Sequence, residues 1–288
     1  MTSNLVVLLA AAACGGATPS SSVRNGTPPA SVAPVDESDP IEAQIPGDSV
    51  AVFYEASWSE YPVVDCPFGK GEQSASFTAV RPGDVHLMLY PGDFQRSELT
   101  KCLLGYLTGA DPAAKATDDG DTTAITSRVL AFQLKWHPHF MTLAIPEQGG
   151  PPASTAPSPS ATQITAFHAM RGAKVAMWSR LPFMKVLTGV DAPELTVLLD
   201  AWEMPAEWHR KVSGTITARF ASAADARAAA AQIATGHLAT ITDPALIAAA
   251  KGLKIEVSDA TLRATVTNFT FDQRELEKQL APVLEQVR

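Results

Sequence analysis

Two tracts rich in proline, serine and small residues divide this 288-residue chain and limit what it can fold into. The first ends near Pro46, and the second reads G-G-P-P-A-S-T-A-P-S-P-S-A-T from Gly149 to Thr162. Such a composition cannot bury enough apolar surface to offset the loss of chain entropy on folding. We therefore expect two folded segments of ordinary domain size. The expected parts are a tether at 14–46, a first domain at 47–147, a linker at 148–162 and a second domain at 163–288. One domain with a long loop is the alternative.

Strand and helix patterns alternate in both segments. The first segment suggests a strand at 85–90, a helix at 94–108 and strands within 122–136, with a further strand at 140–145. The second repeats this order, with a strand at 212–220, an Ala-rich helix at 223–235 and strands within 253–271. A β-α-β-β unit used twice predicts an α+β fold, in which each small domain is an antiparallel sheet with helices on one face.

Several local signals fix where these elements begin and end. Asp93 is the expected N-cap of the first helix and Gly109 its end, while Ser222 and Gly236 bracket the Ala-rich helix. In the last strand, the apolar positions change parity between Val266 and Phe269, which predicts a β-bulge near Asn268.

A ten-residue apolar run, L-V-V-L-L-A-A-A-A-C, occupies residues 5–14 and is followed by Gly15 and Gly16. Its length is that of the apolar core of a secretory signal, and it is too short to cross a bilayer as a helix. With its small residues and final cysteine, the run resembles the signal of bacterial lipoproteins, whose lipobox reads Leu-(Ala/Ser)-(Gly/Ala)-Cys. Here Ala11 stands where leucine is usual, and no Lys or Arg precedes the run.

The resemblance implies that residues 1–13 are cleaved and that Cys14 is acylated and becomes the mature N-terminus. Each acyl CH₂ buried in the bilayer stabilises such an anchor by about 0.8 kcal/mol. In this family, Asp after the cysteine favours retention in the inner membrane. Gly15 stands there instead, so we expect an exported protein anchored to the outer membrane, on its periplasmic or surface face. An ordinary cleaved signal peptide is the alternative.

Charge and motifs narrow the function classes. The net charge is −8 with no basic stripe, so a nucleic-acid partner is not expected. The sequence contains no G-x-S-x-G, S-x-x-K, H-E-x-x-H, Walker A or G-x-G-x-x-G motif. We therefore expect no cofactor.

The three cysteines divide into an acylated Cys14 and a pair, Cys66 and Cys102. Cys102 falls on the apolar stripe of the first helix, and Cys66 lies in a D-C-P-F-G turn. In an oxidising compartment an even pair favours a disulfide between them, although two unrelated buried thiols are the alternative.

Two histidines two residues apart, His137 and His139, form the one local constellation with metal-binding chemistry. A Zn²⁺ or Cu²⁺ site needs at least a third ligand, for which His168 and Asp65 are candidates without a sequence link. Two exposed histidines in a turn around Pro138 are the simpler interpretation.

Aromatic residues gather in two places and could form a binding surface for a sugar, a peptide or a protein. The first group is Tyr54, Trp58 and Tyr61, and the second is Trp202 and Trp208. Either group could equally cover a core. Around the second group, Glu203, Glu207 and Trp208 could form a carboxylate site, but a solvated amphipathic helix at 200–210 accounts for them as well.

The sequence therefore predicts a membrane-anchored lipoprotein of the cell envelope that acts without catalysis, by binding or scaffolding an envelope protein. A ligand-binding or hydrolytic enzyme whose site is assembled from distant residues is the first alternative. A metal-binding lipoprotein that uses His137 and His139 is the second.

Overall fold

The computed structural model describes most of the chain from Ile41 onward. The described residues are 41–56, 76–81, 86–91, 95–128, 131–145, 156–206, 208–236, 238, 244–272, 274–275, 278 and 281. The predicted signal segment, Cys14, Trp58, Tyr61 and Cys66 lie outside them.

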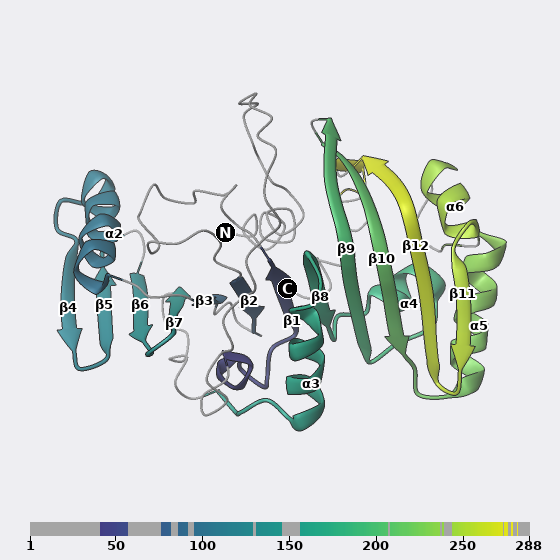
Figure 1. Cartoon of the computed structure of the whole chain (residues 1–288), viewed down its shortest axis with the longest axis horizontal. Coiled ribbons are helices and arrows are strands. Elements are labelled where there is room, and N and C mark those ends of the chain that lie inside the picture. The colour runs from purple at the N-terminus through teal and green to yellow at the C-terminus, as the bar shows by residue number, and fades with distance from the viewer. Residues whose placement is uncertain are drawn as a thin grey trace.

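The described strands form one antiparallel sheet of twelve strands (Figure 1). The strands of the first half are β1 (Ala51–Glu55), β2 (Ser76–Val80), β3 (His86–Pro91), β4 (Lys115–Asp119), β5 (Thr122–Thr126), β6 (Ala131–Trp136) and β7 (Phe140–Ile145). Those of the second half are β8 (Val175–Ser179), β9 (Glu194–Ala206), β10 (His209–Arg219), β11 (Lys254–Ser258) and β12 (Thr261–Asp272). The helices are η1 (Ile41–Gln44), α2 (Arg96–Ala110), α3 (Ala161–Met170), α4 (Phe183–Thr188), α5 (Ala223–Thr235) and α6 (Pro244–Lys251).

The two halves meet at the pairing of β1 with β8, in which Ala51 lies opposite Ser179 and Glu55 opposite Val175. From this centre the order runs outward as β1-β2-β3-β7-β6-β5-β4 on one side and β8-β9-β10-β12-β11 on the other (Figure 1). Each half therefore contributes a three-strand meander, a helical crossover to the sheet edge, and strands that return toward the meander. This arrangement agrees with the repeated order expected from the sequence.

The α+β class with antiparallel strands is confirmed. The two helices of the predicted β-α-β-β repeat, α2 and α5, pack on the same face of the sheet, which we call the α5 face. The opposite face, which we call the α3 face, carries η1 and α3 over the central strands. Helices thus lie on both faces, because the central strand β1 is apolar on both sides: Val52 and Tyr54 pack on the α3 face, Ala51 and Phe53 on the other.

Helix α2 covers the outer strands of the first half. Its buried stripe of Leu99, Leu103 and Leu107 packs against Ile125, Leu134 and Met141. The expected bounds of this helix are wrong at both ends: the N-cap is Gln95, without a side-chain hydrogen bond, and the helix runs through Gly109 to Ala110. Gly109 does not end it because the next residue, Ala110, favours helix.

The expected amphipathic helix at 200–210 is also wrong, because these residues belong to the β9–β10 hairpin. Trp208 adopts a positive φ of 63° at the turn, and Val212 pairs with Trp202. The charged residues are spaced as on a solvated helix, which explains the wrong prediction. In the structure, β10 pairs with β12 on its other side, and this pairing stabilises the strand conformation of the hairpin.

The bulge predicted near Asn268 is confirmed. The pairing of β10 with β12 shifts register between Val212 and Gly214, opposite Phe269 and Val266. Asn268 has a φ of 50°, and its backbone N–H donates to Ser213 Oγ at 2.9 Å. The bulge restores burial parity in a strand whose apolar residues change sides.

The folded body also takes in the predicted ends of the tether and the linker. Ile41, Glu42 and Ile45 are buried, so residues 41–46 belong to the body. Helix α3 begins at Ala161, two positions before the expected start of the second domain at 163, and the Gly47 N–H donates to Pro157 O at 2.7 Å. Both boundaries of the folded body therefore lie inside the Pro/Ser-rich tracts, where the buried side chains of Ile41, Ile45 and Gln163 stabilise them.

Glycine 214 is required where β9 and β10 approach each other. A Cβ at this position would lie 2.0 Å from Leu198 O. We predict that Gly214→Ala lowers the free energy of unfolding by about 1–3 kcal/mol through overpacking. The matched control is Gly105→Ala in α2, where a Cβ meets nothing within 4 Å; it should stabilise by about 0.5–1 kcal/mol. Urea unfolding measures both, and equal effects would contradict this account.

Candidate functional site

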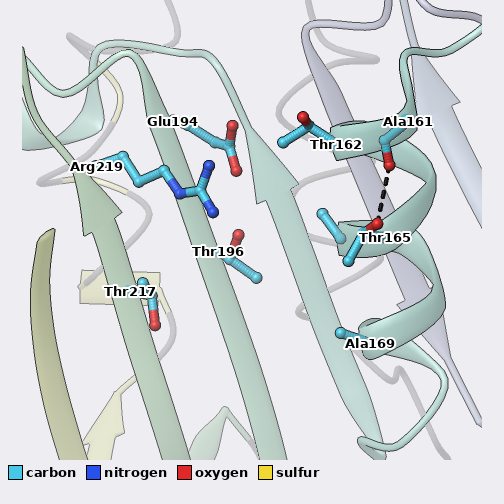
Figure 2. Close-up of a pocket in the computed structure, with 9 residues that line it drawn as sticks. Ala161, Thr162, Thr165, Ala169, Glu194, Thr196, Thr217 and Arg219 are labelled. Atoms are coloured by element: carbon cyan, nitrogen blue, oxygen red, sulfur yellow. Dashed lines mark hydrogen bonds between the residues drawn. The ribbon is translucent and has the colours of Figure 1, made fainter.

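A groove of about 540 Å³ runs between α3 and strands β9 and β10 on the α3 face (Figure 2). The helix covers the central strands and leaves the neighbouring strands open, so the groove has a helical wall and a floor of strand side chains. Its lining consists of Ala161, Thr162, Thr165, Ala166, Ala169, Glu194, Thr196, Thr217 and Arg219.

Local chemistry fixes the position of the helical wall. Ser160 and Gln163 form a capping box at the start of α3, and the Gln163 side-chain amide also donates to Gly47 O at 3.0 Å. On the buried side of the helix, Phe167 packs edge-on against Trp178 with ring centroids 5.3 Å apart. The opposite side of α3 then presents only small side chains to the groove.

Strand pairing arranges the floor in two rows. Thr196 lies opposite Thr217, and Glu194 lies opposite Arg219. Directly opposed residues point to the same face with Cβ atoms about 4.5–5.5 Å apart. Figure 2 shows the Glu194 carboxylate and the Arg219 guanidinium at the same end of the groove, with the two threonines farther along the floor.

This lining is suited to binding. Threonine hydroxyls both donate and accept hydrogen bonds, and the pair Glu194 and Arg219 offers one group of each charge. The arrangement can therefore recognise a polar surface through hydrogen bonds and through charges of both signs.

A buried ion pair joins α3 to the start of the described chain. Glu42 on η1 is 2% exposed and accepts a hydrogen bond from Arg171 Nη1 at 3.2 Å. His168 Nδ1 lies 3.7 Å from the same carboxylate oxygen, on a side chain that is 78% exposed. This ion pair places His168 beside η1.

Tyr54, for which the sequence left open a binding surface or a core position, is a core residue. Its ring packs against Phe77 with centroids 4.9 Å apart, and the residue is 5% exposed. The pKa of its hydroxyl is raised above the ordinary value, mainly by burial. The Arg171 guanidinium opposes this rise in pKa, and the Glu42 carboxylate adds to it. Strand β1 lies at the centre of the sheet, which leaves its aromatic ring no access to a partner. Trp58 and Tyr61 lie outside the described residues.

Trp202 and Trp208 are half-buried near the tip of the β9–β10 hairpin. The guanidinium carbon of Arg210 lies 5.9 Å from the Trp202 ring centroid, and that of Arg274 lies 4.4 Å from the Trp208 centroid. Trp202 also packs with Phe269 and Phe271 in a cluster around Leu199 and Val212. The two tryptophans therefore lie in the same hairpin, and neither of them lines the groove.

The histidine pair lies in the turn between β6 and β7. The His137 ring stacks on Phe140 with centroids 4.0 Å apart and an interplanar angle of 13°, while His139 is exposed. Within the described part of the chain, no three His, Cys, Asp or Glu side chains are grouped as metal ligands. Asp65 lies outside that part, so a metal site through these histidines stays a prediction.

Comparison with known proteins adds information on the fold alone. No family model and no curated protein matches the chain. Among solved structures, crystal form I of TP0453 superposes with a TM-score of 0.51 at 11% sequence identity, covering 85% of this chain and 97% of that one. At this identity the likeness supports a shared architecture and carries no residue roles. None of the described helices is long and apolar enough to span a membrane.

Sequence reasoning missed every residue of the groove. The signal that could have found its floor is the polar alternation of Glu194 with Thr196 and of Thr217 with Arg219. The alternation shows which side chains share a face, but not that β9 and β10 lie beside α3. Helix α3 itself was hidden because its first residues end the Pro/Ser-rich tract.

We predict that Arg171→Met loosens η1 from α3, because it leaves the Glu42 carboxylate buried without its partner. Breaking a buried pair in this way costs about 3–5 kcal/mol, and we expect the lower end because Arg171 is 25% exposed. The double variant Glu42→Gln/Arg171→Met should recover part of the loss, since no unpaired charge remains. Denaturant unfolding measures this, and a loss below about 1 kcal/mol for Arg171→Met would show that the pair does not hold η1.

Proposed function

We propose that this chain is a lipid-anchored protein of the cell envelope that binds a partner protein through the groove and has no catalytic role. The observation that carries the proposal is the composition of the groove lining: small and hydroxyl side chains with one carboxylate and one guanidinium among the described residues. An interface between separately folded proteins is only about as apolar as the rest of the protein surface, so a polar lining is compatible with a protein partner.

The sequence of the N-terminal region supports the anchor. Residues 5–14 have the length and ending of a lipoprotein signal, and Gly15 favours the outer membrane. Helix η1, where the described chain begins, packs against α3, which forms one wall of the groove. A chain anchored at Cys14 would therefore be tethered from the side of the body that carries η1 and α3.

The floor of the groove continues into a wider polar surface, which favours a protein over a small molecule as the partner. Beyond Thr217, the next residue across the sheet is Arg263, and Glu256 follows it on β11. Thr215 is likewise followed by Thr265 and Lys254. The rows give a partner hydrogen-bonding groups and charges of both signs across four strands.

A site-specific crosslink tests the groove in cells. We predict that p-benzoyl-L-phenylalanine in place of Thr165, on the helical wall, captures one defined envelope protein after irradiation. The matched control places the same amino acid at Arg227, an exposed position of α5 on the opposite face, and should give no such adduct. Cys14→Ala should release the chain from the membrane fraction and abolish the adduct.

Filling the groove checks that the adduct depends on this site. Ala169→Trp places a large ring in the groove, whereas Ala228→Trp places it on an exposed position of α5. The first should reduce adduct formation at least tenfold and the second should not. Recovery of the same adduct from Arg227 and Thr165, or its survival in Ala169→Trp, would rule out the groove as the binding site.

We also propose the disulfide between Cys66 and Cys102. Cys102 lies on α2 and packs against the cluster around Leu103, while Cys66 lies outside the described residues. In Cys14→Ala only this pair remains of the three cysteines, so the prediction is simple: iodoacetamide modifies neither thiol until a reductant is added. Reduction should lower the free energy of unfolding by about 4 kcal/mol for a loop of this length. Modification of both thiols without reductant would show that the bond is absent.

A further inference from the structure

A second hollow of about 390 Å³ lies on the α3 face, over the strands of the first half. Strands β5, β6 and β7 form its floor, η1 forms one wall, and residues 156–159 form another. It shares no lining residue with the groove and is therefore a separate site.

One ammonium group stands at the centre of the floor between two hydroxyls. Lys135 lies opposite Thr122 on β5 and opposite Thr142 on β7, so the three side chains point to the same face. Gln133, two positions from Lys135 on β6, adds an amide to the same face. Lys135 forms no ion pair with any residue that the structure describes.

The walls combine polar groups with rigid apolar ones. Gln44 and Asp121 bring an amide and a carboxylate to the hollow, and the His137 ring is held flat against Phe140. Three prolines contribute rigid apolar rings to the walls: Pro46 from the chain after η1, and Pro157 and Pro159. The bond from the Gly47 N–H to Pro157 O, at 2.7 Å, fixes these two segments to each other.

The segment that contains Pro157 and Pro159 packs tightly against the turn after η1. A Cβ at Gly47 would lie 2.3 Å from Ser158 O. The two proline-bearing segments are thus in direct backbone contact. The hollow is therefore formed before any ligand arrives, as small-molecule sites usually are.

We propose that this hollow binds a saccharide that carries an acidic group. Lys135 is placed to neutralise the acid, and the Thr142 hydroxyl and the Gln133 amide can hydrogen-bond to sugar hydroxyls in either direction. The Thr122 hydroxyl donates to Asp121 Oδ1 at 3.2 Å and can accept from a sugar hydroxyl. Asp121 can accept hydrogen bonds from further hydroxyls, and the proline rings match the apolar face of a pyranose. The volume lies within the range of roughly 300–1,000 Å³ typical of small-molecule sites. This site is independent of the groove and of the partner proposed for it.

Titration of the full chain, purified in detergent, with three sugars tests the proposal. D-glucuronate and D-glucose 1-phosphate supply the acid as a carboxylate or as a phosphate, and D-glucose lacks it. We expect saturable binding of at least one acidic sugar in isothermal titration calorimetry, at least tenfold tighter than that of glucose. Which acidic sugar binds identifies the kind of acid that the site accepts.

Two substitutions locate the binding. Lys135→Met should weaken binding of the acidic sugar at least tenfold and remove the preference over glucose, while Lys115→Met, on the exposed edge strand β4, should leave binding unchanged. Thr142→Val, which keeps the side-chain shape, should weaken binding about threefold or more. Circular dichroism shows whether each variant is folded.

The proposal is overturned if the folded chain binds neither acidic sugar, or if Lys135→Met and Lys115→Met bind as tightly as the unmodified chain. Ala169→Trp, which fills the groove, should leave sugar binding unchanged. A failure of the groove proposal and a failure of this one are therefore separate results.

Discussion

The pairing of β1 with β8 is the interaction on which the rest of the structure depends. Four consecutive residues of β1, Ala51–Tyr54, are buried because helices cover both faces of the sheet at this point. The same pairing joins strands from the two halves into one sheet, with Ser179 against Ala51 at one end and Val175 against Glu55 at the other. Without it, the first strand of each meander would be paired on one side only.

Both candidate sites follow from how few helices cover the α3 face. Helices η1 and α3 extend over the central strands, whereas α2, α4 and α5 cover the opposite face more fully. The outer strands therefore expose polar side chains beside the central helices, on one side as the groove and on the other as the sugar-sized hollow. A sheet that is apolar on one face and polar on the other needs no further helix there.

The sequence predicted the parts of the fold that depend on local pattern. The α+β class, the Ala-rich helix between Ser222 and Gly236, and the bulge at Asn268 follow from caps and parity and are confirmed. The segment at 200–210 was misjudged because helical spacing of charges says nothing about the strands that flank it. The groove as a whole could not be predicted, since Thr165 and Thr217 come together only through the placement of α3 beside β9. The choice between a binding surface and a core for Tyr54 also needed the tertiary structure, because only the sheet order shows that β1 is central.

The central pairing also sets the order in which the chain can mature. Ser179 Oγ donates to Val50 O across a separation of 129 positions, so most of the chain must be available before β1 gains its second neighbour. Until then, the first half presents an apolar strand with unpaired backbone groups, which is the kind of edge that recruits other chains. Successful assembly thus depends on the speed with which the second half arrives, and a delay at residues 156–175 would expose the first half to self-association.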